Sequence, residues 1–275
     1  MDNKLLVIKY GGNAMTDQNI RDQLLQNICT LVAEGHQLIL IHGGGPFIEK
    51  ALQAARIESE FIDGHRVTTE EAMTHIEMAL KGNVNATLVG AINRMGARAV
   101  GLSGKDGKII VARKRYGARM VEGVQQEVDL GRVGDVEKVN EELLQILLKN
   151  NYIPVITCIA SDRNGKDFNI NADVFAGHIA GAMGASEFIV MTDVDGLLRD
   201  VNDRDSLINE IGVGEISQMI ADGSIQGGML PKLEACETAM GKGAKSVRII
   251  NGTKPEQLLQ LAAEEPTGTL IKQDL

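Results

Sequence analysis

Short apolar runs rich in Val, Ile and Leu recur along the chain. They lie at Leu5–Ile8, Leu38–Ile41, Ala97–Leu102, Ile153–Ile159, Phe188–Thr192 and Val247–Ile250. An uninterrupted apolar run of this length predicts a strand buried on both faces, because a strand with one solvated face alternates apolar and polar residues. A sheet covered on both sides is therefore expected.

Helical spacing fills the intervals between these runs. Between the first two strands the apolar residues that fall at this spacing are Ile20, Leu24, Ile28, Leu31 and Val32, which predicts a β-α-β unit. Further helices are predicted near residues 46–56, 70–80, 83–95, 138–149, 172–183, 214–222, 231–242 and 255–263. The helix at 70–80 is expected to open with a capping box, with Thr68 as the cap and Glu71 three residues later.

The alternation of buried strands and amphipathic helices predicts the α/β class, as a three-layer αβα sandwich with a mainly parallel open sheet. One region interrupts it, because the segment from Gly107 to about residue 136 has the pattern of an antiparallel hairpin. No segment between the predicted elements has the composition of a proline-rich or serine-rich linker. We therefore expect two lobes of one unit, not two tethered domains.

Composition narrows the possible partners. The net charge of −9 and the low aromatic content of 3% disfavour nucleic acid, which calls for a basic face and stacking platforms. The first apolar run is interrupted by Lys9 and resembles no signal peptide, and no run reaches the length of a membrane span. A soluble, cytoplasmic protein is expected. Cys29, Cys158 and Cys236 are far apart and are expected to be buried thiols.

Two glycine-rich turns follow neighbouring strands. They are "VIKYGG", with Lys9, Gly11 and Gly12, and "LILIHGGGPFIEK", with Gly44 and Gly45. Either turn alone would be an ordinary tight β-α turn. Together, at strand ends, they predict a nest of backbone N–H donors that phosphate oxygens can approach closely. The common phosphate-binding fingerprints are absent, so this would be a different cradle.

Two later segments complete the pattern. "NINADVFAGHIAG" places Asn169, Asn171 and Asp173 at a helix start, and "GGMLPKLEAC" contains Lys232. Singly, these residues would be helix caps and a surface lysine. In combination with "KYGGNAM", "IHGGGPFI", "GHRVT", "GLSGKDG", "VDLGRVGDVEKVN" and "MTDVDG", they closely resemble the acetylglutamate kinases of the amino-acid kinase family. These enzymes phosphorylate N-acetyl-L-glutamate in arginine biosynthesis, and the resemblance runs from about Leu5 to about Ile271.

The resemblance implies one amino-acid kinase domain over residues 1–275, with an acceptor-binding lobe of about 1–177 and a nucleotide-binding lobe of about 178–275. It implies three catalytic residues. Lys9 would meet the transferring phosphoryl group, Lys232 would stabilise charge on the ATP side, and Asp173 would hold both ammonium groups. Such roles suit phosphoryl transfer, whose transition state spreads charge over phosphate oxygens.

For the nucleotide, the resemblance implies that Gly11 and Gly12 approach the phosphates of ATP, together with Lys9 and Lys232. The pocket for the rest of the nucleotide would be lined by Thr192, Asp193, Val194 and Met229. Asp193 and Asp195 look like a metal pair, but the resemblance implies that Mg²⁺ arrives with ATP and stays on its phosphates. No metal ligand is therefore expected from the chain.

For the acceptor, the resemblance implies that Gly44 and Gly45 cradle the phosphoryl group and Arg66 grips the α-carboxylate. Asn169 would orient the substrate, and Gly64 would leave room for it. Arg66 could instead form an ordinary surface salt bridge, although its planar fork suits a carboxylate. The acceptor carboxylate is ionised at neutral pH, so no general base is required. His42 and His65 are accordingly expected to serve packing or hydrogen bonding.

Two other functions remain open. A related kinase of lysine biosynthesis acts on an aminoadipate carried by a small acidic protein, and "ARKRYGAR" (Ala112 to Arg119) could supply its basic docking face. A nucleotide-binding protein without turnover would be expected to lack Lys9, Asp173 or Lys232, and all three are present. Two departures, Ala86 in place of a common lysine and His65 in place of Leu or Gln, affect only the expected fine specificity.

A homodimer that arginine does not inhibit is also expected. In the arginine-sensitive branch of the family, an additional N-terminal helix joins dimers into a hexameric ring. Here only eight residues precede Lys9, and Leu5–Ile8 belong to the first strand. The C-terminal segment also lacks the histidine and the "LLLE" pattern of the sensitive enzymes.

Overall fold

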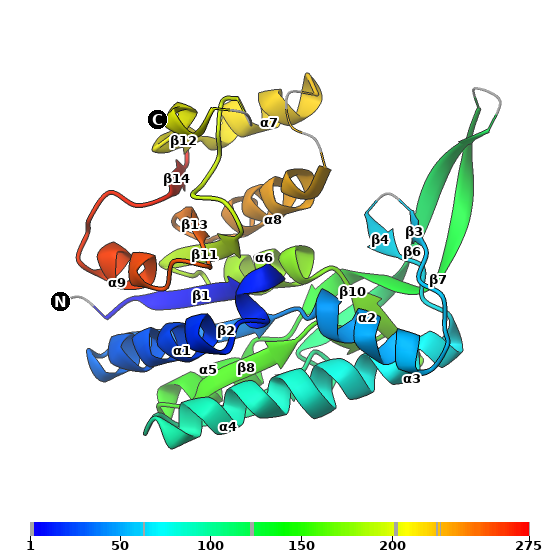
Figure 1. Ribbon diagram of the computed structural model, residues 1–275, viewed down its shortest axis with the longest axis horizontal. Helices are drawn as coiled ribbons and strands as arrows, with labels where there is room; N and C mark the ends of the chain where they lie inside the picture. Colours follow the sequence, from blue (N-terminus) through cyan, green and yellow to red (C-terminus); the bar gives the residue numbers. More distant parts are fainter. Residues whose placement is uncertain are drawn as a thin grey trace.

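The computed structural model describes residues 3–62, 64–121, 124–200, 203–223, 225 and 227–274. Its centre is an eight-stranded sheet (Figure 1). In spatial order the strands are β12 (Glu210–Gly212), β14 (Thr269–Lys272), β13 (Val247–Asn251), β11 (Glu187–Thr192), β1 (Leu5–Tyr10), β2 (Gln37–His42), β8 (Ile153–Thr157) and β5 (Ala99–Ser103). Neighbouring strands are parallel except β13 and β14. All six predicted strands lie in this sheet.

Helices cover both faces of the sheet, as predicted. Along β1, Leu6 and Ile8 enter one apolar core with α1, α4 and α9, whereas Val7 enters the opposite core with α5, α6 and α8. Successive side chains of a strand point to opposite faces, so an apolar run feeds both cores. The helices are α1 (Gln18–Ala33), α2 (Gly45–Ala54), α3 (Glu70–Glu77), α4 (Ala86–Arg94), α5 (Glu142–Lys149), α6 (Ala172–Ala182), α7 (Val213–Ala221), α8 (Leu230–Gly241) and α9 (Glu256–Ala262).

The two helices predicted at 70–80 and 83–95 form one continuous helical run. A π-helical segment, η2 (Met78–Asn85), joins α3 to α4 without a break (Figure 1). Gly82 lies in this segment at the expected break between the two helices, but the π-helical turn continues the helical run through it. The remaining short helical turns are η1 (Gly12–Met15), η3 (Asp106–Lys108), η4 (Arg204–Ser206) and η5 (Gly227–Met229).

The capping box predicted for α3 is wrong by one residue. Thr69 is the N-cap, and its hydroxyl accepts from the Ala72 N–H at 3.1 Å. The backbone of Thr68 is occupied elsewhere, because its N–H donates to Leu130 O and its carbonyl accepts from the N–H of Arg132. Pairing with the strand β7 therefore shifts the helix start.

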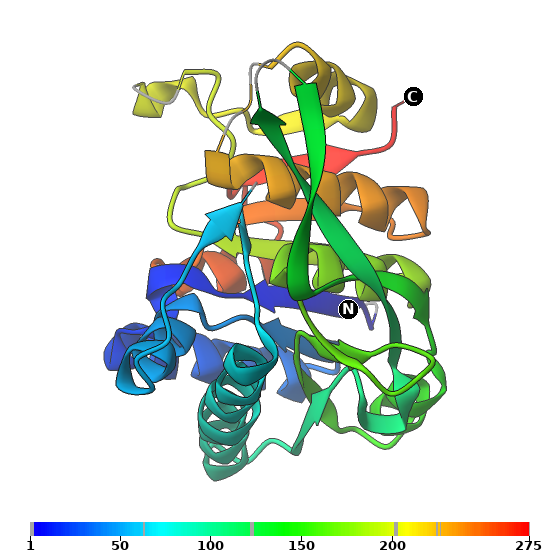
Figure 2. The same cartoon turned by 90° about the vertical axis from the view of Figure 1, so that its right-hand side faces the viewer.

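A second β unit lies beside the main sheet. It contains β6 (Ile110–Val121), β7 (Val124–Val139), β9 (Ile159–Ser161) and β10 (Asp167–Ile170). The predicted hairpin is present, with β6 and β7 antiparallel and projecting as a long twisted ribbon (Figures 1 and 2); residues 122 and 123 lie outside the described part. The predicted strand Ile153–Ile159 is divided, because β9 leaves the main sheet to pair with β10.

A two-stranded ribbon of β3 (Phe61–Ile62) and β4 (His65–Arg66) lies beside this hairpin. The predicted lobe boundary at residues 177 and 178 falls inside α6, and one apolar core extends on both sides of it. The division into an acceptor-binding and a nucleotide-binding lobe stays a prediction.

Candidate functional site

The two glycine turns meet at the carboxyl edge of the sheet. Strands β1 and β2 are parallel neighbours, with Lys9 opposite Ile41 and Tyr10 opposite His42. The N–H of Gly43 then donates to Tyr10 O at 3.1 Å, which ties one turn to the other. Parallel strands end at the same edge, so "KYGG" and "HGGG" are brought side by side as predicted.

At two of these glycines, a Cβ would approach a neighbouring side chain closely. A Cβ on Gly12, where φ is +74°, would lie 2.9 Å from Asp193 Oδ1. A Cβ on Gly44 would lie 2.6 Å from Leu80 Cδ2, on the π-helical segment. Both atoms end flexible side chains that can shift, so the positive φ of Gly12 is the stronger reason for glycine at that position.

A cavity of about 260 Å³ opens at this edge. Most of the predicted site residues line it, namely Lys9, Gly11, Gly12, Gly44, Gly45, Gly64, Arg66, Asn169 and Asp173. They come from separate parts of the chain: β1, the start of α2, the β3–β4 ribbon, β10 and the start of α6. Phe61, Cys158 and Asn171 also line the cavity, although they carry no role in the sequence prediction.

Three charged residues form a chain of ion pairs: Lys9 and Asp173 line this cavity, and Lys232 pairs with Asp173 from α8. Lys9 Nζ lies 2.9 Å from Asp173 Oδ1, and Lys232 Nζ lies 3.3 Å from Asp173 Oδ2. The side chains of Lys9 and Asp173 are 7% and 8% exposed. Burial alone would raise the pKa of Asp173, but the two ammonium groups outweigh it and hold this pKa below its ordinary value. One carboxylate thus balances two cations, and the group keeps an excess of positive charge.

Asp173 is positioned by the start of α6. Asn171 is the N-cap, and its side-chain oxygen accepts from the N–H groups of Asp173 and Val174 at 2.8 and 3.3 Å. Asp173 stands in the first helical turn, where the helix dipole favours a negative charge. The predicted pairing with both lysines is present, whereas the catalytic roles of these residues stay a prediction.

Arg66 also lines this cavity, and its side chain is 9% exposed. Its Nη1 donates to Glu49 Oε2 at 2.7 Å and to the hydroxyl of Ser59, and its guanidinium lies 4.5 Å from the ring centre of Phe61. The salt bridge considered from the sequence is therefore present, but on a buried side chain facing a cavity. The hydrogen bond from Arg66 lowers the pKa of Glu49.

Glu49 and Ser59 were missed by the sequence prediction. Glu49 is four residues after Gly45 in α2, so helical periodicity alone places it above the glycine turn. Ser59 precedes the β3–β4 ribbon and carries no recognisable signal.

Four other residues predicted for the nucleotide, Thr192, Asp193, Val194 and Met229, are not among the residues that line this cavity. Asp193 adjoins Gly12, and Thr192 ends β11, where its carbonyl oxygen accepts from the N–H of Gly252 at 2.8 Å. Val194 is 40% exposed, and Met229 lies in η5, next to the helix that carries Lys232. Their predicted contacts with a nucleotide stay a prediction.

Asp195, the second carboxylate of "MTDVDG", is tied to neighbouring residues. Its Oδ1 lies 2.7 Å from Lys254 Nζ and accepts from Asn251 Nδ2 at 3.0 Å. The hydrogen bond from Lys254 lowers the pKa of Asp195. Within the described ranges, no cluster of three or more His, Cys, Asp or Glu side chains could hold a metal ion.

The three cysteines are buried free thiols, as predicted. Cys158 lines the cavity, but burial raises its pKa to about 12, so the thiolate needed for nucleophilic chemistry is not formed at neutral pH. None of the helices in the described segments is long and apolar enough to cross a membrane.

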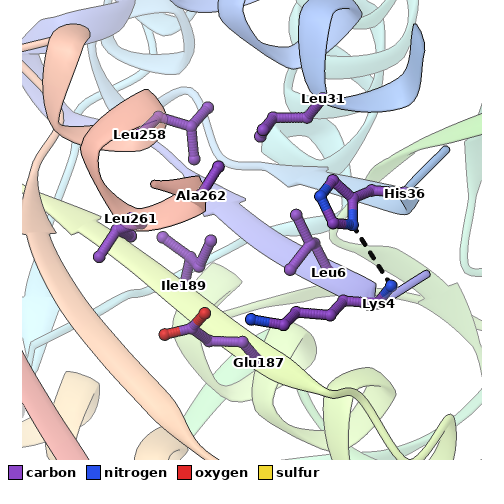
Figure 3. A pocket seen from close by; sticks show the side chains of 9 residues that line it. All are labelled: Lys4, Leu6, Leu31, His36, Glu187, Ile189, Leu258, Leu261 and Ala262. Atoms are coloured by element: carbon purple, nitrogen blue, oxygen red, sulfur yellow. Dashed lines mark hydrogen bonds between the residues drawn. The ribbon is translucent and has the colours of Figure 1, made fainter. Parts of the chain in front are cut away.

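A much smaller hollow lies at the amino ends of the same strands (Figure 3). Its volume is about 20 Å³, the space of roughly one water molecule. Apolar side chains of Leu6, Leu31, Ile189, Leu258 and Leu261 form most of its wall. Unlike this hollow, the cavity at the carboxyl edge has the size and polar lining for a substrate.

Residues 4–251 match the profile of the amino acid kinase family, and the chain belongs to this family. The match covers both glycine turns and the lysine–aspartate–lysine group.

Among relatives, the chain is 45% identical over 273 residues to the acetylglutamate kinase of Methanocaldococcus jannaschii, which covers 98% of this chain and 91% of that protein. The structure of smu.665 from Streptococcus mutans UA159 is similar with a TM-score of 0.77 and 27% identity, covering 98% of this chain and 99% of the other. N-acetylglutamate synthase from Neisseria gonorrhoeae shares the fold with a TM-score of 0.82 at 22% identity; the match covers 99% of this chain and 60% of that one.

Proposed function

We propose that this protein transfers the γ-phosphoryl group of ATP to the side-chain carboxylate of N-acetyl-L-glutamate, the acetylglutamate kinase reaction of arginine biosynthesis. A carboxylate oxygen attacks the γ-phosphorus, the bond to the β,γ-bridging oxygen breaks, and an acyl phosphate and ADP result. The observation that carries the proposal is the Lys9–Asp173–Lys232 group beside the glycine turns, with Lys9, Asp173 and Arg66 lining one cavity. Relatives that are 45% identical over 98% of the chain are named acetylglutamate kinase.

The side chains and glycine turns at this site fit a nucleoside triphosphate. Lys9 and Lys232 outnumber the one carboxylate between them and supply a net positive charge, and Gly12 lines the cavity beside Lys9. Gly11 and Gly12 would face the phosphates, and Thr192, Asp193, Val194 and Met229 would hold the rest of the nucleotide. Mg²⁺ would arrive on the phosphates and supply further charge neutralisation when bound.

The acceptor substrate fits the part of the cavity that Arg66 lines. Arg66 has five N–H donors, and the two contacts at Nη1 leave others to bind the α-carboxylate of the substrate. Asn169 would orient the substrate, while Gly44 and Gly45 cradle the phosphoryl group. No base is assigned, because the attacking carboxylate is already ionised.

The competing carrier-protein substrate is less well supported. Its docking face would need free cations on "ARKRYGAR", but three of these side chains are paired. Lys114 lies 2.7 Å from Asp129, Arg115 lies 2.7 Å from Asp135, and Arg119 lies 3.3 Å from Glu60. Paired cations attract an acidic partner weakly, so a small free acceptor is favoured.

A homodimer that arginine does not inhibit remains part of the proposal. In support, β5 is an edge strand of the main sheet, and the η2 segment packed against it carries Met78, which is 63% exposed. An edge strand beside an exposed apolar side chain suits a two-fold contact. Light scattering would count the subunits, and L-arginine added during turnover would test the control. A hexamer inhibited by arginine would contradict both statements.

One assay tests the reaction. The protein is incubated with MgATP and N-acetylglutamate, free glutamate or aspartate, and any acyl phosphate is trapped with hydroxylamine. A hydroxamate is expected with N-acetylglutamate only. A signal that is absent with N-acetylglutamate and strong with another amino acid would overturn the substrate assignment.

A further inference from the structure

His42 is the last residue of β2 and stands directly before the glycine turn, with no exposed surface. Its Nδ1 lies 2.8 Å from the carbonyl oxygen of Gly43, and its Nε2 lies 2.9 Å from Asn85 Nδ2. A carbonyl oxygen only accepts, so Nδ1 must carry the hydrogen. An amide nitrogen only donates, so Nε2 must be the acceptor. The two neighbours therefore select one neutral tautomer, and burial agrees with it by lowering the pKa of His42 to about 4.

This hydrogen bond determines the direction of the next N–H group. The Gly43–Gly44 peptide is planar, so the Gly43 carbonyl and the Gly44 N–H point in opposite directions. Because the carbonyl is held toward the buried His42 ring, the N–H of Gly44 points away from that ring, and Gly43, Gly44 and Gly45 all line the cavity. Gly44 is buried, and among the described residues no acceptor for this N–H is present. A buried donor without a partner is rare in proteins and suits an incoming anion.

Asn85 holds the imidazole in place from the π-helical segment. Its side chain is buried, and Nδ2 also donates to Val155 O on β8 at 2.9 Å. A Cβ on Gly101 of β5 would lie 2.2 Å from Asn85 Oδ1, so that glycine makes room for the amide. Asn85 is therefore fixed against two strands of the central sheet. π turns inside α-helices occur frequently at functional sites, and this one places Asn85 against His42.

We propose that His42 and Asn85 are positioning residues for phosphoryl transfer, which lock the Gly43–Gly44 peptide so that the Gly44 N–H faces the transferring phosphoryl group. The proposal rests on the proposed kinase function. Neither side chain touches the substrate; both act through the peptide. The same π-helical segment also supplies Leu80, whose Cδ2 would lie 2.6 Å from a Cβ on Gly44.

Two substitutions separate the two hydrogen bonds of His42. In His42→Asn, the side-chain Nδ2 occupies about the place of the imidazole Nδ1 and can still donate to Gly43 O. In His42→Gln, the longer amide reaches about the place of Nε2 and keeps a polar contact with Asn85, but the donor to Gly43 is lost. Both variants are uncharged and smaller than wild type, so general loosening of the core affects both.

We expect kcat to fall by about 10- to 100-fold in His42→Gln, since misplacing a catalytic group by about 1 Å has effects of this size. His42→Asn should stay several-fold more active than His42→Gln, and KM for both substrates should change little in either. Equal kcat values in the two variants, or a loss confined to KM, would overturn the proposal. If a different amino acid proves to be the acceptor, the proposed substrate fails, but the same ranking of variants is expected with that acceptor.

A measurement on the wild-type protein requires no variant. ¹⁵N–¹H correlation spectra of the histidine rings should show His42 as the neutral Nδ1–H tautomer from pH 6 to pH 8. Asn85→Leu, which removes the donor to Nε2, should release this preference and lower kcat without changing KM. An Nε2–H tautomer or a charged His42 in the wild type would refute the arrangement regardless of activity.

Discussion

The two ends of strand β1 differ in how closely their surroundings are packed and in how much charge they bury. At the carboxyl end, a buried lysine and aspartate border a cavity of about 260 Å³ among glycine turns. At the amino end, apolar side chains close on a hollow of about 20 Å³, and Lys4 keeps its side chain 42% exposed (Figure 3). Burying charge costs free energy even when the charge is paired, so a fold selected for stability alone would resemble the amino end throughout. The proposed function accounts for the carboxyl end, because the buried charges and open space there would bind a charged substrate.

The largest expected effect is on stability at the amino end. Leu258→Ala removes a side chain that is 1% exposed, and we expect the free energy of unfolding to fall by about 2 to 5 kcal/mol while kcat changes little. Chemical denaturation measures this loss. Ile146→Ala, at a side chain 52% exposed, is the matched control and should cost much less. A Leu258 variant of normal stability and low kcat would reverse the comparison.

At the carboxyl end the effect should fall on the reaction. Lys9→Ala and Lys232→Ala should each lower kcat by about 10² to 10³, the usual consequence of deleting one preorganised donor. The hydroxamate assay measures the rate, and denaturation midpoints check folding. If Lys9→Ala retained nearly full kcat, the mechanism would be wrong.

Arg66 should act on substrate binding. Arg66→Lys should raise KM for N-acetylglutamate by about 10- to 100-fold, because a hydrogen bond to a charged group contributes about 1.5 to 3 kcal/mol. Glu49→Gln keeps an acceptor for the guanidinium and should raise this KM less. A larger effect on kcat than on KM would move Arg66 from binding to the chemical step.

The smallest effect is expected at Lys4. Its ammonium lies 3.7 Å from Glu264, on side chains 42% and 82% exposed. Lys4→Ala should lower the free energy of unfolding by less than about 1 kcal/mol and leave kcat unchanged. It therefore serves as the matched lysine control for Lys9→Ala, one residue before the start of the same strand and outside the site. A fall in kcat with Lys4→Ala would mean that the two ends are coupled.

Most long elements could be predicted from local pattern. Six of the eight strands of the main sheet are apolar runs, and most helices begin and end within one or two residues of their predicted limits. The strands that escaped prediction, β3, β4, β9, β10, β12 and β14, are two to four residues long, too short for periodicity to mark them. Each exists because of a partner strand. The cap of α3 was misplaced for the same reason, since β7 occupies the backbone of Thr68.

Local sequence was sufficient to specify the glycine turns, the strand ends and the chemical types at the site, because these depend on neighbours a few residues away. Distant packing specified the rest. Asp173 meets Lys232 across 59 residues, and Asn85 meets His42 across 43. No periodicity records such contacts, since they depend on which strands become neighbours and on one π turn that rotates Asn85 toward the core. Residue types thus follow from the chain itself, whereas the buried geometry that orients them forms only when the sheet and helices pack.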